Sequence, residues 1–421
     1  MNILNVELLT SSDFIHPSKK IFASYSNRLE GKKIALGITA SIASYLSPKI
    51  ARELMRHGAD VIPIMTENSL SMIGKDLMWW ATGNEPIINV SGNLEHIQYA
   101  GIMNNPIDLM LIAPCTTNTV AKLATGISDT SVTLIASTIA GKHIPIMVLC
   151  VAHEDLINSP ATKENMAKIR KNGIAIIDPV LEEGKAKMPE IDDIILAVFE
   201  KIESNELNNR NVIITGGPTR EFIDDVRFIS NPSSGKTALE LAKESLIQGA
   251  DVQLVLGPTI VQIPKAIRSI NVITSQEMTE KVLSLLDTNP NSIVILASAM
   301  SDFTVSKKSG KIKSGNSLIL DLMPTQKLSS QIKEKYPKST LILYKAESGL
   351  SKEDLIKSAT KKLEIDNADL IIANDISQQN SGFESDNNQV IIINKTGSSR
   401  EINDSKSFIA KEIISEVIKL I

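Results

Sequence analysis

Val212-Ile213-Ile214-Thr215-Gly216-Gly217-Pro218-Thr219-Arg220-Glu221 is the segment that decides the fold, together with Val226-Arg227-Phe228-Ile229-Ser230-Asn231-Pro232-Ser233-Ser234-Gly235-Lys236. Residues 212–214 are apolar and predict a strand, the Gly-Gly-Pro predicts a turn, and the polar residues after it lead into a helix. In α/β proteins, a strand, loop and helix in this order present backbone N–H groups to phosphate. The segment therefore predicts a nucleotide site.

The segment fits neither of the two common phosphate-binding motifs. Gly235-Lys236-Thr237 matches the end of a P-loop, but a P-loop also needs glycine five residues before Gly235, where Ser230 stands. A Rossmann G-x-G-x-x-G is missing as well. The sequence thus indicates a nucleotide binder with its own signature.

The same design occurs twice. Residues 33–37 predict a buried parallel strand, followed by a turn and by a helix to about residue 57 whose apolar positions recur at i+4: Ile42, Leu46, Ile50 and Leu54. Residues 211–215, 236–248 and 251–256 repeat the strand, helix and strand, and both helices lead into Gly-Ala-Asp-Val, at 58–61 and 249–252. Two such starts predict an α/β protein with two doubly wound, mostly parallel-sheet, Rossmann-like domains.

A polar and charged stretch, residues 200–210, separates the two designs and is the predicted linker. We expect an N-terminal extension over residues 1–30, a first domain over 31–199 and a second over 211–421. A chain of 421 residues is long enough for two domains with full cores.

Composition narrows the function class. The net charge of −4 argues against a nucleic-acid binder, which would carry a basic face. The two cysteines, Cys115 and Cys150, form no metal or disulfide pattern and favour a reducing cytosol. The N-terminus lacks a signal-peptide pattern, and the apolar region 131–152 is broken by Gly141 and Pro145. We expect a cytoplasmic protein without a membrane span.

Polar residues follow several predicted strands, where sites gather in open α/β sheets. In the first domain, Ser41 is more readily explained as a helix N-cap than as a ligand contact, although a capped N-terminus can also bind an anion. Thr116, Asn118 and Thr119 follow residues 109–113 and could hold a phosphate or the polar edge of a flavin. His96, His143 and His153 have no metal-like partners, so a surface or core histidine is the simplest interpretation from the residues alone, and no metal ligands are identified.

In the second domain, residues 293–297 are followed by Asp302 and by four lysines around Gly310, at 307, 308, 311 and 313. Such a lysine run is either a solvated face or a basic loop that neutralises a triphosphate with its Mg²⁺. Spacing alone does not choose between these two interpretations.

The long segment of the second domain resembles phosphopantothenate–cysteine ligase, and later motifs match that family in order. They are Ala299-Met300-Ser301-Asp302-Phe303, Lys311-Ile312-Lys313, Ala373-Asn374-Asp375, Gly382-Phe383 and Ser385-Asp386-Asn387-Asn388. In the first domain, residues 37–45, His96-Ile97 and Ala113-Pro114-Cys115-Thr116-Thr117-Asn118-Thr119 resemble the flavin-dependent phosphopantothenoylcysteine decarboxylase. The order is that of the bifunctional coenzyme A biosynthesis family. His16-Pro17-Ser18-Lys19 and Glu183-Gly184-Lys185-Ala186-Lys187 are similar to its archaeal branch.

This resemblance implies two consecutive steps. The ligase activates the carboxylate of 4′-phosphopantothenate with CTP, and the cysteine amine then attacks the acyl-cytidylate. FMN next oxidises the cysteinyl thiol, which allows CO₂ to leave, and returns the electrons to give 4′-phosphopantetheine. Family members assemble through both domains, so a homo-oligomer is expected, with small molecules as the other partners.

The resemblance also implies site residues. Asn231 is the expected catalytic residue of the ligase, and His96 and His153 are those of the decarboxylase. The expected FMN contacts are Gly37, Thr39, Ser41, Ile42, Thr66, Thr116, Asn118 and Thr119. The expected CTP contacts are Gly217, Pro218, Thr219, Asp302, Lys311, Lys327, Tyr344 and Lys362, with Tyr344 standing where the family often has Phe.

One segment departs from the family pattern. The family closes over the substrate with Pro-Ala-Met-Asn, or with His for Asn in some archaeal-like members, whereas this chain has Cys150-Val151-Ala152-His153. Residues 185–189 replace the cysteine-bearing flap of many bacterial members. Alternatives are therefore a ligase with a degenerate flavin domain that serves as an assembly scaffold, or a non-catalytic flavin- or nucleotide-binding regulator. A nicotinamide oxidoreductase is disfavoured by the missing glycine fingerprint.

Overall fold

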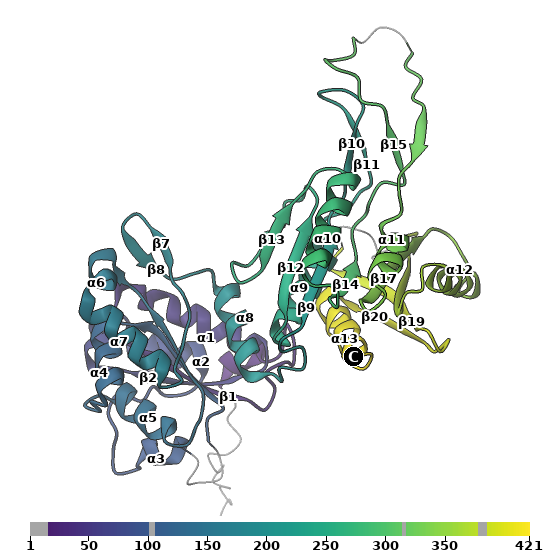
Figure 1. Ribbon diagram of the computed structural model, residues 1–421. Helices are drawn as coiled ribbons and strands as arrows, with labels where there is room; N and C mark the ends of the chain where they lie inside the picture. Colours follow the sequence, from purple (N-terminus) through teal and green to yellow (C-terminus); the bar gives the residue numbers. More distant parts are fainter. Residues whose placement is uncertain (1–15, 101–105, 314–316, 378–384) are drawn as a thin grey trace, which may run out of the picture. The chain divides into compact units, whose positions relative to one another are not determined.

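The computed structural model describes residues 16–100, 106–313, 317–377 and 385–421 (Figure 1). The chain forms two compact units, Met1–Ile202 and Glu203–Ile421, called unit 1 and unit 2 below. Gly382 and Phe383 of the ligase-like motifs lie outside the described residues, as does the first half of the expected N-terminal extension.

Unit 1 is built on a parallel sheet with the spatial order β2-β1-β3-β4-β6. Its strands are β1 (Lys33–Ile38), β2 (Asp60–Met65), β3 (Leu109–Cys115), β4 (Ile146–Cys150) and β6 (Ala175–Ile176). Counted along the chain, this is the doubly wound order 2-1-3-4-5, in which the direction of winding reverses between β1 and β3. The strands are buried almost throughout, as expected for a parallel sheet covered on both faces.

Helices cover the sheet of unit 1. Residues of α4 (Thr117–Thr125), α5 (Ser131–Ala140) and α7 (Pro160–Lys171) share one apolar core with β1, β3 and β4. Helix α1 (Ser47–Arg56) packs with α2 (Lys75–Thr82) and α8 (Ile191–Ile202). The remaining elements are the 3-10 helices η1 (Pro17–Ile21), η2 (Ile42–Leu46) and η3 (Glu67–Ser71), the helices α3 (Glu95–Tyr99) and α6 (Glu154–Asn158), and the small sheet of β5 (Ala152–His153), β7 (Val180–Glu182) and β8 (Lys185–Lys187).

The helix expected after β1 begins differently from the prediction. The first turn is η2, and the α-helix starts only at Ser47. Ile50 and Leu54 are fully buried as expected, but Ile42 is 80% exposed, so its place in the apolar stripe was predicted wrongly. A 3-10 helix has three residues per turn, so an i+4 pattern does not keep one face across the junction.

Unit 2 has an eight-stranded sheet with the order β13-β12-β9-β14-β17-β18-β19-β20. Its strands are β9 (Asn211–Gly216), β12 (Asp251–Leu256), β13 (Arg268–Asn271), β14 (Ile293–Leu296), β17 (Thr340–Glu347), β18 (Leu370–Asp375), β19 (Asn387–Asn394) and β20 (Ser399–Ser405). The first six of the spatial order are parallel, and β19 and β20 run antiparallel. The parallel part has the Rossmann order 3-2-1-4-5-6, and its switch point lies between β9 and β14. The prediction of two doubly wound, mostly parallel sheets is confirmed.

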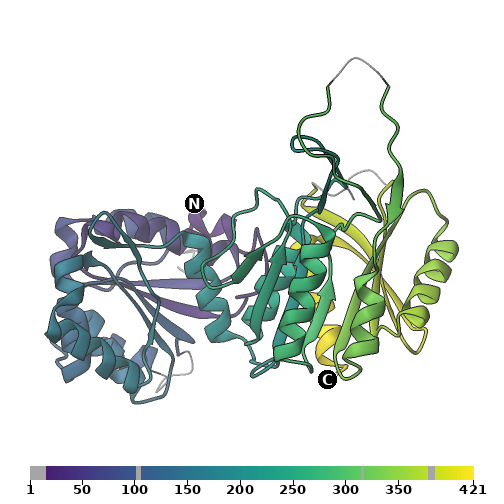
Figure 2. The ribbon, with the colours of Figure 1, turned by 45° about the horizontal axis from the view of Figure 1, so that its top comes forward.

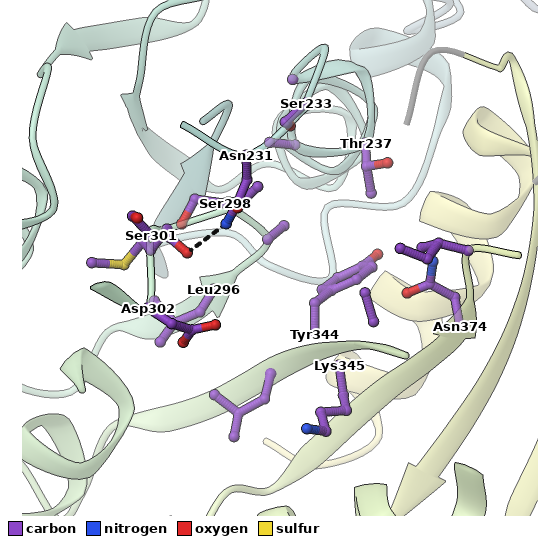
Figure 3. A pocket seen from close by; sticks show the side chains of 18 of the residues that line it. Asn231, Ser233, Thr237, Leu296, Ser298, Ser301, Asp302, Tyr344, Lys345 and Asn374 are labelled. Carbon is purple, nitrogen blue, oxygen red and sulfur yellow. Dashed lines mark hydrogen bonds between the residues drawn. The ribbon is translucent and has the colours of Figure 1, made fainter. Parts of the chain in front are cut away.

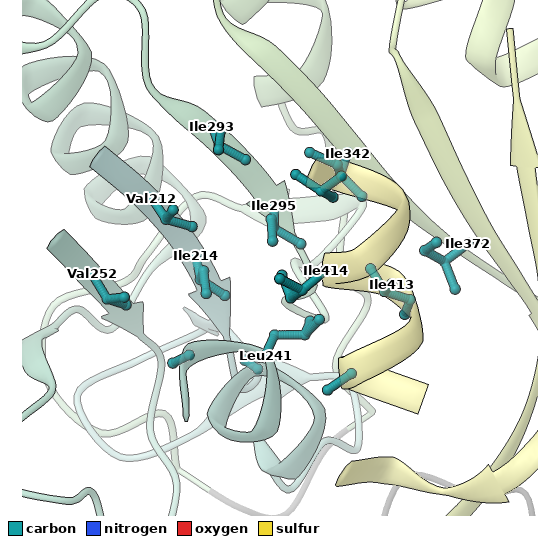
Figure 4. Close-up of a cluster of buried hydrophobic side chains, with 14 of the residues drawn as sticks. Val212, Ile214, Leu241, Val252, Ile293, Ile295, Ile342, Ile372, Ile413 and Ile414 are labelled. Carbon is teal, nitrogen blue, oxygen red and sulfur yellow. The ribbon is translucent and has the colours of Figure 1, made fainter. Parts of the chain in front are cut away.

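Two layers of helices enclose the sheet of unit 2 (Figure 2). Helices α9 (Lys236–Ile247) and α13 (Lys406–Ile418) bury their apolar faces in one core, part of which Figure 4 shows. Helices α10 (Ser275–Thr288), α11 (Leu328–Lys335) and α12 (Lys352–Ile365) contribute to the core on the opposite face. Gly249 follows α9 with φ +84°, a left-handed residue of the kind that commonly ends a helix, and Gly58 with φ +96° does the same after α1.

Two hairpins project from unit 2 and form an arm (Figures 1 and 2). The first pairs β10 (Arg220–Phe222) with β11 (Phe228–Ser230), and the second pairs β15 (Phe303–Val305) with β16 (Leu322–Pro324). β10 contacts β15, which joins the hairpins. The polar loop predicted between the Gly-Gly-Pro turn and α9 therefore contains a β-hairpin that the sequence pattern did not reveal.

Candidate active sites

A cavity of about 510 Å³ opens at the switch point of unit 2 (Figure 3). Three segments supply most of its walls. They are residues 231–238 at the start of α9, residues 296–302 after β14, and residues 343–346 of β17. Because parallel strands end at the same edge of a sheet, β9 and β14 deliver their following residues to one place.

Helix α9 turns its N-terminus to this cavity. Gly235 is the N-cap residue with φ +77° and has no side chain that could cap the helix, while the Lys236 N–H donates to the Ser234 hydroxyl oxygen over 3.4 Å. A Cβ on Gly235 would lie 3.3 Å from the Thr259 hydroxyl and would also be strained at this φ. Open N–H groups and the helix dipole make such an end a binding place for phosphate.

The cavity wall is rich in lysines. Among the described residues that line it are five lysines and one carboxylate, that of Asp302. The lysines are Lys236, Lys327, Lys345, Lys362 and Lys406. Most of these lysines have acidic partners, such as Asp386 at 2.7 Å from Lys236 and Asp366 at 2.8 Å from Lys362. Lys406 is only 5% exposed, and burial together with nearby Lys236 lowers its pKa. The arrangement suits a polyanionic ligand.

Three predicted ligase residues, Asn231, Asp302 and Lys327, line this cavity. The Asn231 side-chain amide donates to the Met300 carbonyl oxygen over 3.1 Å. Asp302 and Lys327 form an ion pair at the mouth of the cavity, where both are exposed. The structure thus brings together the predicted catalytic residue and two predicted nucleotide contacts, which lie up to about a hundred residues apart in the chain.

Tyr344 and Lys362 also line the cavity, whereas four other predicted contacts do not. Thr219 is fully buried, its hydroxyl lies 2.8 Å from the Ser275 hydroxyl, and it accepts a hydrogen bond from the Ser301 N–H over 2.9 Å. A Cβ on Gly217, which has φ +70°, would lie 3.0 Å from the Gly257 carbonyl oxygen. Gly217, Pro218 and Thr219 therefore support the loop and do not line the cavity. Lys311 does not line it either, and lies on the exposed arm.

Ser298, Lys345 and Lys406 line the cavity but were missed from the sequence. Ser298 follows the predicted strand 293–297, so its position was an available signal, whereas Lys345 lies within β17, a strand that was not predicted from the sequence. Lys406 starts α13, about a hundred residues after Asp302, and no local pattern connects it with the site.

In unit 1, Thr39 and Thr116 tie the ends of β1 and β3 together at the switch point. Thr39 donates its hydroxyl to the Pro114 carbonyl oxygen, and its hydroxyl oxygen accepts the Thr116 N–H, both over 2.9 Å. Thr116 also caps α4 by accepting the Thr119 N–H. Ser41 caps η2, as the sequence favoured. The starts of α4 and η2 thus both lie at the switch point of this sheet.

Thr66, at the end of neighbouring β2, has a buried hydroxyl oxygen with no hydrogen-bond partner among the described residues. A polar edge of a bound molecule would satisfy it, so the site fits a flavin on this observation. Ile42 and Asn118 are exposed beside these strand ends and can contact a ligand. Gly37 has a packing explanation, since a Cβ there would lie 3.1 Å from Ile112 Cγ1.

The two predicted decarboxylase histidines differ in environment. His96 lies in α3, which packs on α5, and its Nδ1 is buried without a partner among the described residues. Helix α5 begins beside the end of β2, where Ser131 donates to the Met65 carbonyl oxygen over 2.9 Å. His153 is exposed in β5 and stands opposite Lys185 of β8.

Both units match known protein families. A model described as "Flavoprotein" covers residues 22–203, and one described as "DNA/pantothenate metabolism flavoprotein C-terminal domain" covers residues 207–421. The coenzyme A biosynthesis bifunctional protein CoaBC of Thermococcus kodakarensis is 39% identical over 409 residues, which are 97% of this chain and 100% of that relative. The chain belongs to this family of bifunctional coenzyme A biosynthesis proteins.

Other members of the family agree in extent. The CoaBC protein of Methanocaldococcus jannaschii is 38% identical over 97% of this chain and 99% of its own length. A crystal structure of the C-terminal domain of a coenzyme A biosynthesis bifunctional protein CoaBC is 30% identical, covers 52% of this chain and 98% of that chain, and superposes with a TM-score of 0.42. The resemblance stated from the motifs is confirmed.

Membership makes the chain a bifunctional enzyme of coenzyme A biosynthesis, with the ligase and decarboxylase activities expected from the sequence. Within the described ranges, no helix is long and apolar enough to cross a membrane. In the same part of the chain, no group of three or more His, Cys, Asp and Glu side chains gathers to hold a metal ion.

Proposed function

We propose that the cavity of unit 2 binds CTP with Mg²⁺ and 4′-phosphopantothenate, and that residues 211–421 perform the ligation. The observation that carries this proposal is the meeting of a helix N-terminus with glycine at its N-cap and of five lysines in one cavity at the switch point. The lysines and the helix N-terminus of such a site neutralise phosphate oxygens. The crevice at the carboxyl ends of the strands leaves room for a second substrate. Mg²⁺ enters with the triphosphate and needs no cage of protein ligands, since it commonly binds substrate phosphates and water.

Ligation proceeds in two displacements. The substrate carboxylate attacks the α-phosphorus of CTP and pyrophosphate leaves; the cysteine amine then attacks the acyl carbon and CMP leaves. Asn231 lies beside the reacting carbonyl in this proposal, where its amide can stabilise developing charge as an oriented donor does. Asp302 contacts the nucleotide, Tyr344 packs against it, and the lysines that line the cavity, Lys362 among them, stabilise the phosphate charge.

We further propose that residues 31–199 bind FMN at the ends of β1, β2 and β3 and perform the decarboxylation. FMN supplies the electron acceptor that allows the cysteinyl carboxylate to leave as CO₂. Thr66 offers a hydroxyl that has no partner among the described residues, and Thr116, Asn118 and Thr119 offer polar groups at the start of α4. His96 and His153 hold or orient the substrate in this proposal. The buried free thiols Cys115 and Cys150 suit a cytoplasmic location, and a homo-oligomer is expected.

One assay tests both halves. The purified protein is incubated with 4′-phosphopantothenate, cysteine, CTP and Mg²⁺, and mass spectrometry follows 4′-phosphopantothenoylcysteine and 4′-phosphopantetheine in turn. Both products should form, and without CTP neither should. The intermediate alone, from a colourless protein without flavin absorbance, would favour the scaffold alternative. Neither product, with no release of pyrophosphate, would contradict the proposal.

A further inference from the structure

The hydroxyl of Tyr344 is buried in unit 2 without a hydrogen-bond partner among the described residues. The side chain comes from the middle of β17 and lines the 510 Å³ cavity. In Figure 3 the hydroxyl points away from Asp302 and toward the side of the cavity where Thr237 and Asn374 lie. A buried donor without a described protein partner, in a side chain that lines a cavity, is placed for a ligand.

A second buried tyrosine of the same unit shows what a structural hydroxyl looks like. The Tyr336 hydroxyl lies 2.6 Å from Asp287 Oδ1 and 3.2 Å from the Leu283 carbonyl oxygen. Buried phenol groups normally have such partners, because an unsatisfied one loses its hydrogen bonds to water and gains none. The unsatisfied Tyr344 hydroxyl therefore lowers the stability of the unliganded protein, and folding does not require it.

Packing does not explain the Tyr344 hydroxyl either, since a phenylalanine at this position would fill nearly the same volume. Burial raises the pKa of Tyr344 well above its usual range, so the phenol is protonated at neutral pH and can donate. The hydroxyl is thus a donor for which the described residues supply no acceptor.

We propose that the Tyr344 hydroxyl donates a hydrogen bond to a phosphate oxygen of the nucleotide bound in this cavity. The phosphate is the chosen acceptor because Thr237 belongs to the first turn of α9, whose N-terminus is the phosphate-binding element of the cavity. The inference rests on the proposed function, since it takes a nucleoside triphosphate as the occupant. Tyr344 becomes a phosphate-binding residue of the nucleotide site, beyond its expected packing role.

The test compares Tyr344→Phe with the wild type by calorimetric titration of CTP in the presence of Mg²⁺. Loss of a hydrogen bond to a charged acceptor should weaken CTP binding by about tenfold to a hundredfold. 2′-Deoxy-CTP should show the same fold-change, because it keeps every phosphate oxygen. The unliganded variant should unfold at the wild-type temperature or higher, since only an unsatisfied group is removed.

Tyr336→Phe is the matched control. It should lower the unfolding temperature of the unliganded protein and leave CTP affinity unchanged, the reverse of Tyr344→Phe. Equal CTP affinities of the wild type and Tyr344→Phe would overturn the inference and leave the proposed function intact. A penalty that disappears with 2′-deoxy-CTP would assign the contact to the ribose and also overturn it. Destabilisation of unliganded Tyr344→Phe would reveal a structural partner instead. A wild type that does not bind CTP would overturn the proposed function together with the inference.

Discussion

Thr116 donates its backbone N–H to the hydroxyl oxygen of Thr39 over 2.9 Å, across the switch point of unit 1. The two residues end β3 and β1, which are neighbours in the sheet although 77 positions separate them in the chain. Because the Thr39 hydroxyl also donates to the Pro114 carbonyl oxygen, one side chain holds both strand ends in register at the proposed flavin site.

Thr39→Val should destabilise unit 1 by about 1–3 kcal/mol, because it leaves buried backbone partners unsatisfied. Both tryptophans of the chain, Trp79 and Trp80, lie in α2 of this unit, so their fluorescence reports its unfolding in urea. The midpoint should fall with the slope unchanged. Ser41→Ala is the control: its cap bond to Ala43 is 3.3 Å long and part-exposed, so a smaller fall is expected. An unchanged midpoint for Thr39→Val would show that the tie does not stabilise the sheet.

His96→Asn should abolish CO₂ release from 4′-phosphopantothenoylcysteine while flavin absorbance and ligase activity persist. The reason is that His96 presents a buried imidazole nitrogen with no partner among the described residues, as expected of a group kept for a substrate. The measurement is product formation from supplied 4′-phosphopantothenoylcysteine. His143→Asn is the matched control, because His143 is exposed at φ 59°, a conformation that asparagine readily adopts. Decarboxylation retained in His96→Asn would refute the assignment.

Asn231→Asp should permit pyrophosphate release but block amide formation. Aspartate lacks the N–H₂ that Asn231 donates to the Met300 carbonyl oxygen, and its charge opposes the negative charge that develops when the amine attacks. In rapid-quench measurements, the variant with cysteine should behave like the wild type without cysteine, with a single burst of pyrophosphate and no product. Steady formation of 4′-phosphopantothenoylcysteine would contradict this role.

Asp224 should make the anchoring of the arm depend on pH. Its buried carboxylate accepts the N–H groups of Arg227, Val226 and Ile312. The Arg227 N–H is the largest influence, and these bonds lower the pKa of Asp224 against the opposing effect of burial. A carboxyl whose folded-state pKa is lowered adds stability that is fully present above its unfolded pKa, about 3.9, and is lost as the pH falls through the folded-state value.

Asp224→Asn should therefore increase amide exchange in residues 224–230 and 306–313 most strongly at neutral pH, and the difference from the wild type should shrink below about pH 4. Hydrogen-exchange mass spectrometry at matched pH measures it peptide by peptide. Asp225→Asn removes an exposed ion pair to Lys307 and should change exchange less. A difference that grows on acidification would show that the sign is wrong.

Local patterns fixed much of the fold in advance. The apolar runs at 212–214, 251–256 and 60–65 became β9, β12 and β2, because a buried parallel strand needs a continuous apolar stretch whatever surrounds it. Residues 236–248 were predicted as a helix because their apolar residues share one side, and they form α9 with that side in the core. The gathering of Asn231 and Asp302 at one edge also followed from the strand ends, because parallel strands share their carboxyl edge.

The tertiary structure alone decided what each polar residue contacts. Thr219, in the most informative segment of the sequence, is buried beneath the cavity, whereas Lys406 enters the cavity from the last helix. The hydroxyl of Tyr344 lacks a partner in the part of the chain that the structure describes, and that of Tyr336 has two acceptors within 3.2 Å. Sequence periodicity reports which face of an element is apolar, and the presence or absence of a hydrogen-bond partner depends on residues brought together from distant segments.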